Sequence, residues 1–192
     1  ESIDSDKVTV KILTGGKLTT GKGVNLPVGQ IKMSAITQKD KEDIEFGISQ
    51  KIDLIALSFV QSADDIREAK KLIKMAGEYV PVFAKIEKSS ALENIEDIIL
   101  EADGLMIARG DLGVEMGPYA IPVIQKQIIA KAREKGLPVI IATQMLMSMV
   151  SSPYPTRAEV SDIANAVLDG ADAVMLSDET TVGDFPEEAV KV

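Results

Sequence analysis

Short hydrophobic runs recur along the chain from about residue 51 onward, and an amphipathic segment follows each of them. The runs are rich in β-branched residues and nearly continuous in apolar side chains; they cover residues 52–59, 81–86, 104–108, 138–142 and 171–176. Continuous apolar runs of this length are typical of parallel strands that are covered on both faces. The pattern therefore predicts a parallel sheet whose strands alternate with helices.

Capping signals mark where the intervening helices begin and end. A hydroxyl residue stands three positions before an acidic residue, the spacing of a capping box, at Ser62 and Asp65, Ser90 and Glu93, and Thr156 and Glu159. Apolar stripes at helical spacing follow at Ile66, Ala69, Leu72, Ile73 and Ala76, and at Val160, Ile163, Ala164, Val167 and Leu168. Helix C-caps are expected at Gly136 and Gly170, and Thr37 is the expected cap of a helix over about residues 38–48.

Polar residues gather directly after the predicted strands, at Lys85 and Glu87, residues 109–111, Thr143 and Gln144, and residues 177–179. Periodicity alone does not choose between a doubly wound sheet and a (β/α)8 barrel. Sites built from the C-terminal ends of several strands are typical of the barrel. Of the two α/β folds, the (β/α)8 barrel is therefore favoured.

The first 25 or so residues have a different character. Residues 8–13 alternate between apolar and polar side chains, and glycines punctuate the stretch that follows. This pattern indicates short antiparallel β structure from a separate small domain.

Composition narrows the classes of function. Of the 192 residues, 45% are hydrophobic and 27% are charged, as in an ordinary soluble globular protein. A net charge of −9 argues against a nucleic-acid partner, although a few cations and a metal can still hold a nucleotide. No apolar run reaches membrane-spanning length and no secretory signal is visible, so we expect a cytoplasmic protein without a membrane partner.

The chain has no cysteine and no histidine. Disulfides, thiolate metal sites and cysteine nucleophiles are therefore excluded, and a reducing compartment fits this composition. Any acid, base or metal ligand must be a carboxylate, a lysine, a tyrosine, a hydroxyl group, water or the backbone.

Two short motifs match well-known sequence patterns but lack the surrounding residues or structure that these patterns need to function. Residues 16–22 fit the G-x-x-x-x-G-K core of a P-loop, but Gly23 stands where a metal-binding Ser or Thr is needed and residues 24–27 do not begin a helix. Residues 109–111 spell an Arg-Gly-Asp tripeptide inside an apolar segment at a strand end. We interpret neither as functional in the familiar sense.

Lys85 and Glu87 are two residues apart, so in a strand their side chains point to the same side. Asp111 follows the next strand and is expected beside Glu87. Neighbouring carboxylates repel unless a cation lies between them, and oxygen-only ligation with few protein ligands suits Mg²⁺. A plain ion pair between Lys85 and Glu87 is the alternative.

The next strand exits offer groups that can bind an anion. Gly110 and Gly113 permit close backbone approach, and exposed N–H groups there can donate to an anionic ligand; a tight turn between strand and helix is the alternative. The hydroxyl of Thr143 can donate a hydrogen bond to a ligand. The alternative is that Thr143 is only a polar residue of the kind that ordinarily ends a strand.

Seven segments together resemble the pyruvate kinase family in order and spacing, and the resemblance covers essentially the whole chain. They are residues 22–27 (KGVNLP), 84–87 (AKIE), 108–115 (ARGDLGVE), 142–146 (ATQML), 155–159 (PTRAE), 164–170 (ANAVLDG) and 173–177 (AVMLS). The resemblance implies transfer of a phosphoryl group from phosphoenolpyruvate to ADP, giving pyruvate and ATP in glycolysis. It also implies a homotetramer. By this resemblance, residues 1–25 are the remnant of a small β-rich inserted domain, the end of the B domain, and residues 26–192 form a partial TIM (β/α)8 barrel, the later part of the catalytic A domain.

Site residues follow from the resemblance position by position. Lys85 matches the catalytic lysine that contacts the transferring phosphoryl group, and Glu87 and Asp111 match the ligands of Mg²⁺ or Mn²⁺. Gly110 and Asp111 match the backbone donors to the substrate carboxylate, Thr143 the hydroxyl beside it, and Lys22 the lysine that reaches the nucleotide.

The chain also departs from the family pattern. Residues 88–90 (KSS) and Asp178 differ from the residues often found there. The family places a phosphoryl-binding arginine and most ligands of an essential K⁺ on earlier barrel strands. We therefore expect residues 1–192 alone to be inactive, and a non-catalytic fragment is the alternative to an active enzyme. Another barrel acting on phosphoenolpyruvate or oxaloacetate would lack the Lys22 segment.

Overall fold

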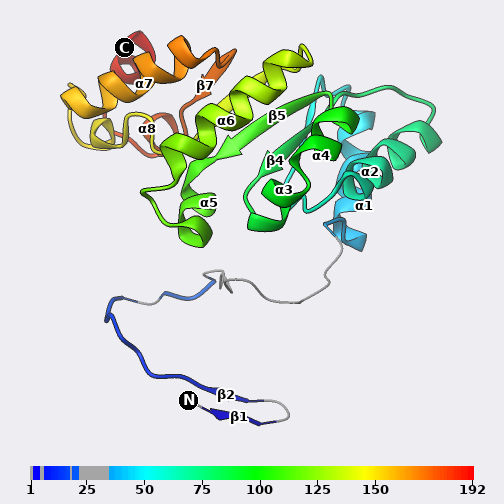
Figure 1. Cartoon of the computed structure of the whole chain (residues 1–192), viewed down its shortest axis with the longest axis horizontal. Helices are drawn as coiled ribbons and strands as arrows, with labels where there is room; N and C mark the ends of the chain where they lie inside the picture. The colour runs from blue at the N-terminus through cyan, green and yellow to red at the C-terminus, as the bar shows by residue number, and fades with distance from the viewer. Residues whose placement is uncertain (1, 5–6, 18, 22–34) are drawn as a thin grey trace.

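The main body of the protein is a five-stranded parallel sheet whose strands lie side by side in chain order (Figure 1). The computed structural model describes residues 2–4, 7–17, 19–21 and 35–192. The strands are β3 (Ile55–Leu57), β4 (Val82–Ile86), β5 (Gly104–Ala108), β6 (Val139–Ala142) and β7 (Ala173–Met175). All the predicted strands are confirmed, each inside its predicted run.

The long helices form one layer, in the same order as the strands. They are α1 (Gln38–Ser49), α2 (Ala63–Met75), α4 (Ile95–Glu101), α6 (Ile121–Glu134) and α7 (Arg157–Asp169), and each packs against the next. A doubly wound fold would reverse its strand order and divide the helices between two faces. The single layer and sequential order are those of a (β/α) barrel, which confirms the predicted α/β class and partial barrel.

Shorter helices follow the strand ends and the longer connections. They are α3 (Ser89–Glu93), α5 (Arg109–Met116), the 3₁₀ turn η1 (Met147–Val150), α8 (Asp178–Thr181) and α9 (Pro186–Lys191). In the described part of the chain, no helix combines the length and the apolar character needed to cross a bilayer.

The sheet has one core face and one site face. Along β4, Val82, Ala84 and Ile86 are fully buried in the main hydrophobic core. Because side chains alternate along a strand, Phe83 and Lys85 point to the opposite face. That face carries Lys85 toward the C-terminal edge of the sheet.

Local capping explains most helix boundaries. Thr37 with Asp40, Ser62 with Asp65 and Thr156 with Glu159 form capping boxes, while Gly136 and Gly170 have positive φ after α6 and α7, as predicted. The predicted box at Ser90 and Glu93 is wrong. Helix α3 begins at Ser89, because the Ser89 N–H donates to Glu115 Oε2 at 2.7 Å and needs no side-chain cap of its own helix.

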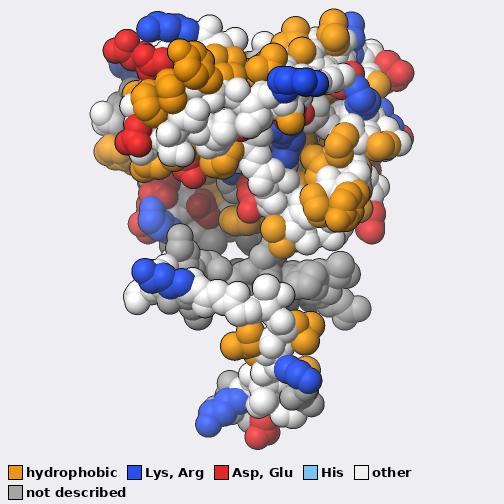
Figure 2. All heavy atoms as spheres, turned by 90° about the vertical axis from the view of Figure 1, so that its left-hand side faces the viewer, with side chains coloured by type: hydrophobic (Ala, Val, Ile, Leu, Met, Phe, Trp, Pro, Cys, Tyr) orange, Lys and Arg blue, Asp and Glu red, His pale blue; other side chains and the backbone are white. Residues whose placement is uncertain are grey.

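The two predicted apolar stripes have different outcomes. On α2, Ile66, Ala69 and Ile73 are buried and Leu72 packs against the core, as expected, but Ala76 is exposed. On α7 only Ile163 of the predicted stripe packs against the core. The rest of that prediction is wrong, since Val160, Ala164, Val167 and Leu168 are exposed and Ala166 is the buried residue. Helix α7 lies beside β7 at the edge of the sheet and packs on α6. Figure 2 views the molecule from this side and shows hydrophobic side chains at its surface.

The N-terminal strands β1 (Ser2–Ile3) and β2 (Val8–Thr9) pair antiparallel, which agrees with the short antiparallel structure expected there. The side chains of Ile3 and Val8 are exposed. Lys22 and the rest of the 22–27 motif lie outside the described residues. The domain boundary near residue 25 stays a prediction.

Glu159 joins the start of α7 to the preceding turn η1. Its carboxylate accepts hydrogen bonds from the N–H and hydroxyl of Ser148 at 2.7 and 2.6 Å, and from the N–H and hydroxyl of Thr156, both at 2.7 Å. Burial raises the pKa of this carboxyl group, but the four hydrogen bonds outweigh burial and lower the pKa from 4.5 to about 2.

We expect Glu159→Gln to lower the free energy of unfolding by about 2 kcal/mol at pH 7. This is less than the full energy of the pKa shift, because Glu159 is only half-buried and solvent screens its interactions. Because the folded pKa is lowered, the stabilisation is complete above the ordinary value of 4.5 and is lost as the pH falls toward 2. Urea unfolding at pH 7 and pH 3.5 should therefore show a smaller difference at the lower pH. Glu187→Gln, at an exposed pair with Lys191, is the control and should change little. An equal loss at both pH values would contradict the prediction.

Candidate active site

The C-terminal ends of β3, β4, β5 and β6 place polar residues along one edge of the sheet. The parallel register pairs Ile86 with Ile107 and Ala108 with Ala142, so the residues just beyond these positions leave the sheet together. Glu87, Asp111 and Thr143 all follow these strand ends. The arrangement confirms that separate runs of the sequence contribute to one edge.

Lys85 and Glu87 form the centre of this edge. Lys85 Nζ lies 2.7 Å from Glu87 Oε1 and donates to Ser58 Oγ at 2.9 Å. The other carboxylate oxygen of Glu87 accepts from the N–H of Phe59 at 2.8 Å. The Glu87 side chain is 3% exposed and that of Lys85 is 24% exposed, so a fixed ammonium group stands at the surface above a buried carboxylate.

This geometry confirms that Lys85 and Glu87 point to the same side of the strand. It also shows that the ion pair considered as the plain alternative is formed. Phe59 has a φ of +57°, which is uncommon for a residue with a side chain, and this backbone directs its N–H toward Glu87. The charge of Glu87 is therefore shared between a cation and a backbone donor.

Gly110 and Thr143 are in direct contact. The N–H of Gly110 donates to Thr143 Oγ1 at 2.9 Å, and a Cβ at position 110 would lie 3.3 Å from the same oxygen. Glycine therefore permits this close approach between the ends of β5 and β6. Asp111 is exposed in the first turn of α5, which begins directly after β5, so the glycine-containing segment is the start of a helix.

Lys88 and Ser89 have a defined place beside the site. Lys88 Nζ lies 2.8 Å from Glu115 Oε1 and 6.0 Å from the centre of the Phe59 ring. Burial raises the pKa of Glu115, but hydrogen bonds from Lys88 and Ser89 outweigh it and lower the pKa. The pair thus ties α3 to α5. Asp178 is exposed at the start of α8.

Sequence reasoning gave no role to three residues at this edge, Ser58, Phe59 and Arg109, although it placed Arg109 among the polar residues after the strands. Ser58 and Phe59 end the first predicted run, where the other strands also carry polar groups, and that analogy could have found Ser58. Arg109 is 7% exposed in an otherwise apolar segment. A buried guanidinium needs partners, and this requirement was the available signal.

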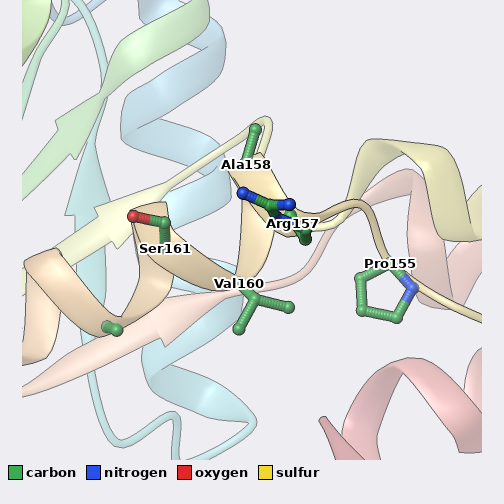
Figure 3. Close-up of a pocket in the computed structure, with 6 residues that line it drawn as sticks. Pro155, Arg157, Ala158, Val160 and Ser161 are labelled. Carbon is green, nitrogen blue, oxygen red and sulfur yellow. The ribbon is translucent and has the colours of Figure 1, made fainter.

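Two hollows lie at the surface of the described residues, and neither is lined by Lys85 or Glu87. One lies beside the start of α7 and is lined by Pro155, Arg157, Ala158, Val160, Ser161 and Ala164 (Figure 3). Its lining is largely apolar, and it holds none of the predicted site residues. A second hollow adjoins the site and includes Arg109, Gly110, Gln144 and Asp162 in its lining.

A partial (β/α) barrel with charged groups at its C-terminal strand ends has the architecture of a barrel enzyme. Residues 1–190 match the family described as "Pyruvate kinase, barrel domain". The chain belongs to the pyruvate kinase family.

Three relatives show the extent of the similarity. The chain is 55% identical over 182 residues to "Pyruvate kinase 2" of Synechocystis sp., covering 95% of this chain and 31% of that protein. It is 53% identical over 186 residues to a pyruvate kinase of Agrobacterium vitis, covering 97% and 38%. It is 47% identical over 192 residues to that of Thermotoga maritima, covering 100% and 41%. The chain thus spans less than half the length of these relatives.

Proposed function

We propose that the full-length protein carrying this segment is a pyruvate kinase, which transfers a phosphoryl group from phosphoenolpyruvate to ADP and gives pyruvate and ATP in glycolysis. The observation that carries the proposal is the Lys85 ammonium group, fixed by Ser58 and Glu87 at the exit of β4. Phosphoryl transfer relies on positioned cations that stabilise charge in the transition state. The similarity to named pyruvate kinases over nearly the whole chain supports the same reaction.

Each site residue has a role in this proposal. Lys85 contacts the transferring phosphoryl group, because its ammonium group is partly exposed and held from below. Asp111 and Thr143 receive the substrate carboxylate through a backbone N–H group and a hydroxyl. The N–H of Gly110, assigned to the same carboxylate, donates to Thr143 Oγ1, so it reaches the carboxylate only by leaving Thr143. While that bond is in place, the hydroxyl proton of Thr143 is available for the ligand. Lys22 reaches the nucleotide.

Glu87 and Asp111 would hold Mg²⁺ or Mn²⁺. Over the described ranges, no group of three or more acidic side chains is arranged as a metal cage. Two carboxylates at neighbouring strand ends fit Mg²⁺, which takes one or two protein carboxylates and fills its shell with water and substrate oxygens. When bound, the metal supplies positive charge next to the enolate that forms as the phosphoryl group leaves. K⁺ is a second cofactor, with its ligands mostly outside this chain.

The partners that follow are phosphoenolpyruvate, pyruvate, ADP and ATP, with no nucleic acid or membrane, in a cytoplasmic homotetramer. The test is a coupled assay for pyruvate release by the full-length protein with ADP, Mg²⁺ and K⁺. Absence of turnover in a folded protein, shown by cooperative unfolding, would refute the proposed function.

A non-catalytic role for residues 1–192 alone is the second candidate. Among the described strands, β3 and β7 lie at the two edges of the sheet and pair on one side only. We therefore expect no measurable turnover from this segment by itself, since phosphoryl transfer depends on several fixed cations acting together. Turnover near that of the full-length protein would contradict this expectation.

A further inference from the structure

The chain takes an unusual path directly after β6. Thr143 and Gln144 have φ values of +69° and +56°, the left-handed region that residues with side chains rarely adopt. Each such residue costs on the order of 1–2 kcal/mol of conformational energy, and two in succession persist only where their surroundings hold them. The turn carries Thr143, a residue assigned above to the substrate carboxylate.

Arg109, at the end of β5, contacts this turn directly. Its Nε and Nη2 atoms donate to the carbonyl oxygen of Thr143 at 3.2 and 3.0 Å, and Nη2 also donates to the carbonyl oxygen of Gln144 at 2.7 Å. Both carbonyl groups of the left-handed turn therefore accept from one planar group. A guanidinium offers donors in a fixed fork, which a lysine ammonium group does not reproduce.

The orientation of the Arg109 side chain is itself fixed. Nη1 donates to Asp162 Oδ2 on α7 at 2.6 Å, and Nη2 lies 3.0 Å from Met145 Sδ. The Arg109 side chain is 8% exposed, while that of Asp162 is 39% exposed. The ion pair thus uses Nη1 of the guanidinium and leaves Nε and Nη2 to donate to the turn.

The residue after Arg109 completes the arrangement, since the N–H of Gly110 donates to the hydroxyl of Thr143. Two consecutive residues therefore hold Thr143 by its backbone and by its side chain. Further along, the N–H of Leu146 donates to Glu179 and that of Ser148 donates to Glu159. These bonds fix the downstream part of the loop, but neither reaches the left-handed turn.

We propose that Arg109 is a positioning residue that holds the left-handed Thr143–Gln144 turn and so presents the Thr143 hydroxyl to the carboxylate of phosphoenolpyruvate. The inference rests on the proposed function, because it acts through the substrate role of Thr143. It predicts an effect confined to one substrate. The bonds from Arg109 to the turn end on the carbonyl groups of Thr143 and Gln144 and do not include Lys85, the residue assigned to the phosphoryl group.

The first test is steady-state kinetics of Arg109→Lys in the full-length protein. Lysine keeps the charge beside Asp162 but cannot serve both carbonyl groups with a rigid fork. We expect the KM for phosphoenolpyruvate to rise about fivefold, as for loss of one hydrogen bond, with kcat and the KM for ADP within about twofold. A fall in kcat with both KM values unchanged would overturn the proposal.

Asp162→Asn is the matched control. Asparagine keeps the shape and an oxygen acceptor for Nη1, and the bonds from Arg109 to the turn do not involve position 162. We expect both KM values to stay within about twofold of wild type. A rise in the KM for phosphoenolpyruvate equal to that of Arg109→Lys would assign the effect to the ion pair and overturn the proposal.

Two further variants separate positioning from general destabilisation. In a Thr143→Ala background, Arg109→Lys should add no further rise in the KM for phosphoenolpyruvate, whereas independent effects would add. Gln144→Gly relieves one left-handed residue and should restore part of the KM in the Arg109→Lys protein, and its folding if that is impaired. Additive effects together with failure of this rescue would overturn the proposal.

Hydrogen exchange of the peptide spanning residues 143–150 reads the holding of the turn without any assay of turnover. Arg109→Lys should increase exchange there and Asp162→Asn should not. Unchanged exchange in Arg109→Lys would overturn the proposal. A wild type that forms no pyruvate would instead refute the proposed function and with it the substrate role of Thr143, while the exchange result would still stand.

Discussion

Replacing Lys85 with Met in the full-length protein is expected to lower kcat by at least about 10²-fold, with little change in the KM for phosphoenolpyruvate. The ammonium group is held between Ser58 Oγ and Glu87 Oε1, and the Lys85 side chain is 24% exposed, so the charge is positioned before substrate arrives. A cation fixed in this way does not need to reorganise as charge develops on the transferring group. Its contribution is therefore greatest in the transition state.

The kinetic pattern distinguishes this role from ground-state binding. A residue that stabilises only the transition state lowers kcat and kcat/KM together, whereas one that binds substrate and transition state equally raises KM alone. A large rise in the KM for phosphoenolpyruvate with kcat retained would reassign Lys85 to substrate binding.

Lys70→Met is the matched control for Lys85→Met. Lys70 is also partly buried and paired, with Asp103 at 3.0 Å, but it lies on α2 in the helix layer. We expect its kcat to remain within about twofold of wild type, because its pair contributes to stability rather than to charge at the strand ends. An equal loss of kcat in both variants would mean that removing any paired lysine damages the protein.

The elements that the sequence predicted well depend on short-range patterns. The apolar runs predicted all the strands of the sheet. The capping boxes at Ser62 and Thr156 predicted the first residues of α2 and α7, because the residues of each box lie in the first turn of the helix that it caps. The side shared by Lys85 and Glu87 follows from the two-residue repeat of a single strand. In each case the residues that determine the structure are neighbours in the chain.

The features that sequence reasoning missed depend on partners far along the chain. Arg109 is explained by carbonyl groups of residues 143 and 144, and the start of α3 by Glu115 on another helix. The exposed stripe of α7 reflects the place of β7 at the sheet edge, which no local period encodes. Strand order was likewise undetermined, because the doubly wound sheet and the barrel share the same alternation of elements.

Replacing Glu87 with Gln should weaken the dependence of the rate on Mg²⁺ far more than it changes stability. Changes in outer-shell groups already cost about 10- to 100-fold in metal affinity, so loss of a direct carboxylate ligand should raise the Mg²⁺ concentration for half-maximal rate at least that far. Glutamine keeps the shape of the side chain but has one acceptor oxygen in place of two, so it can accept from the Phe59 N–H or from Lys85 Nζ and not from both. The substitution therefore removes the charge and one buried contact, and the control variant must lose the same kind of contact.

Glu115→Gln tests whether this effect belongs to the metal. The Glu115 side chain is also 3% exposed, and it too bridges a lysine ammonium group and a backbone N–H, those of Lys88 and Ser89. The two glutamates thus match in burial and in the kind of partner, but only Glu87 is assigned to Mg²⁺. Rates measured over a range of Mg²⁺ concentrations should shift for Glu87→Gln and not for Glu115→Gln. If the Mg²⁺ dependence of Glu87→Gln equals that of wild type, Glu87 serves only as the ion-pair partner of Lys85, and the metal assignment is wrong.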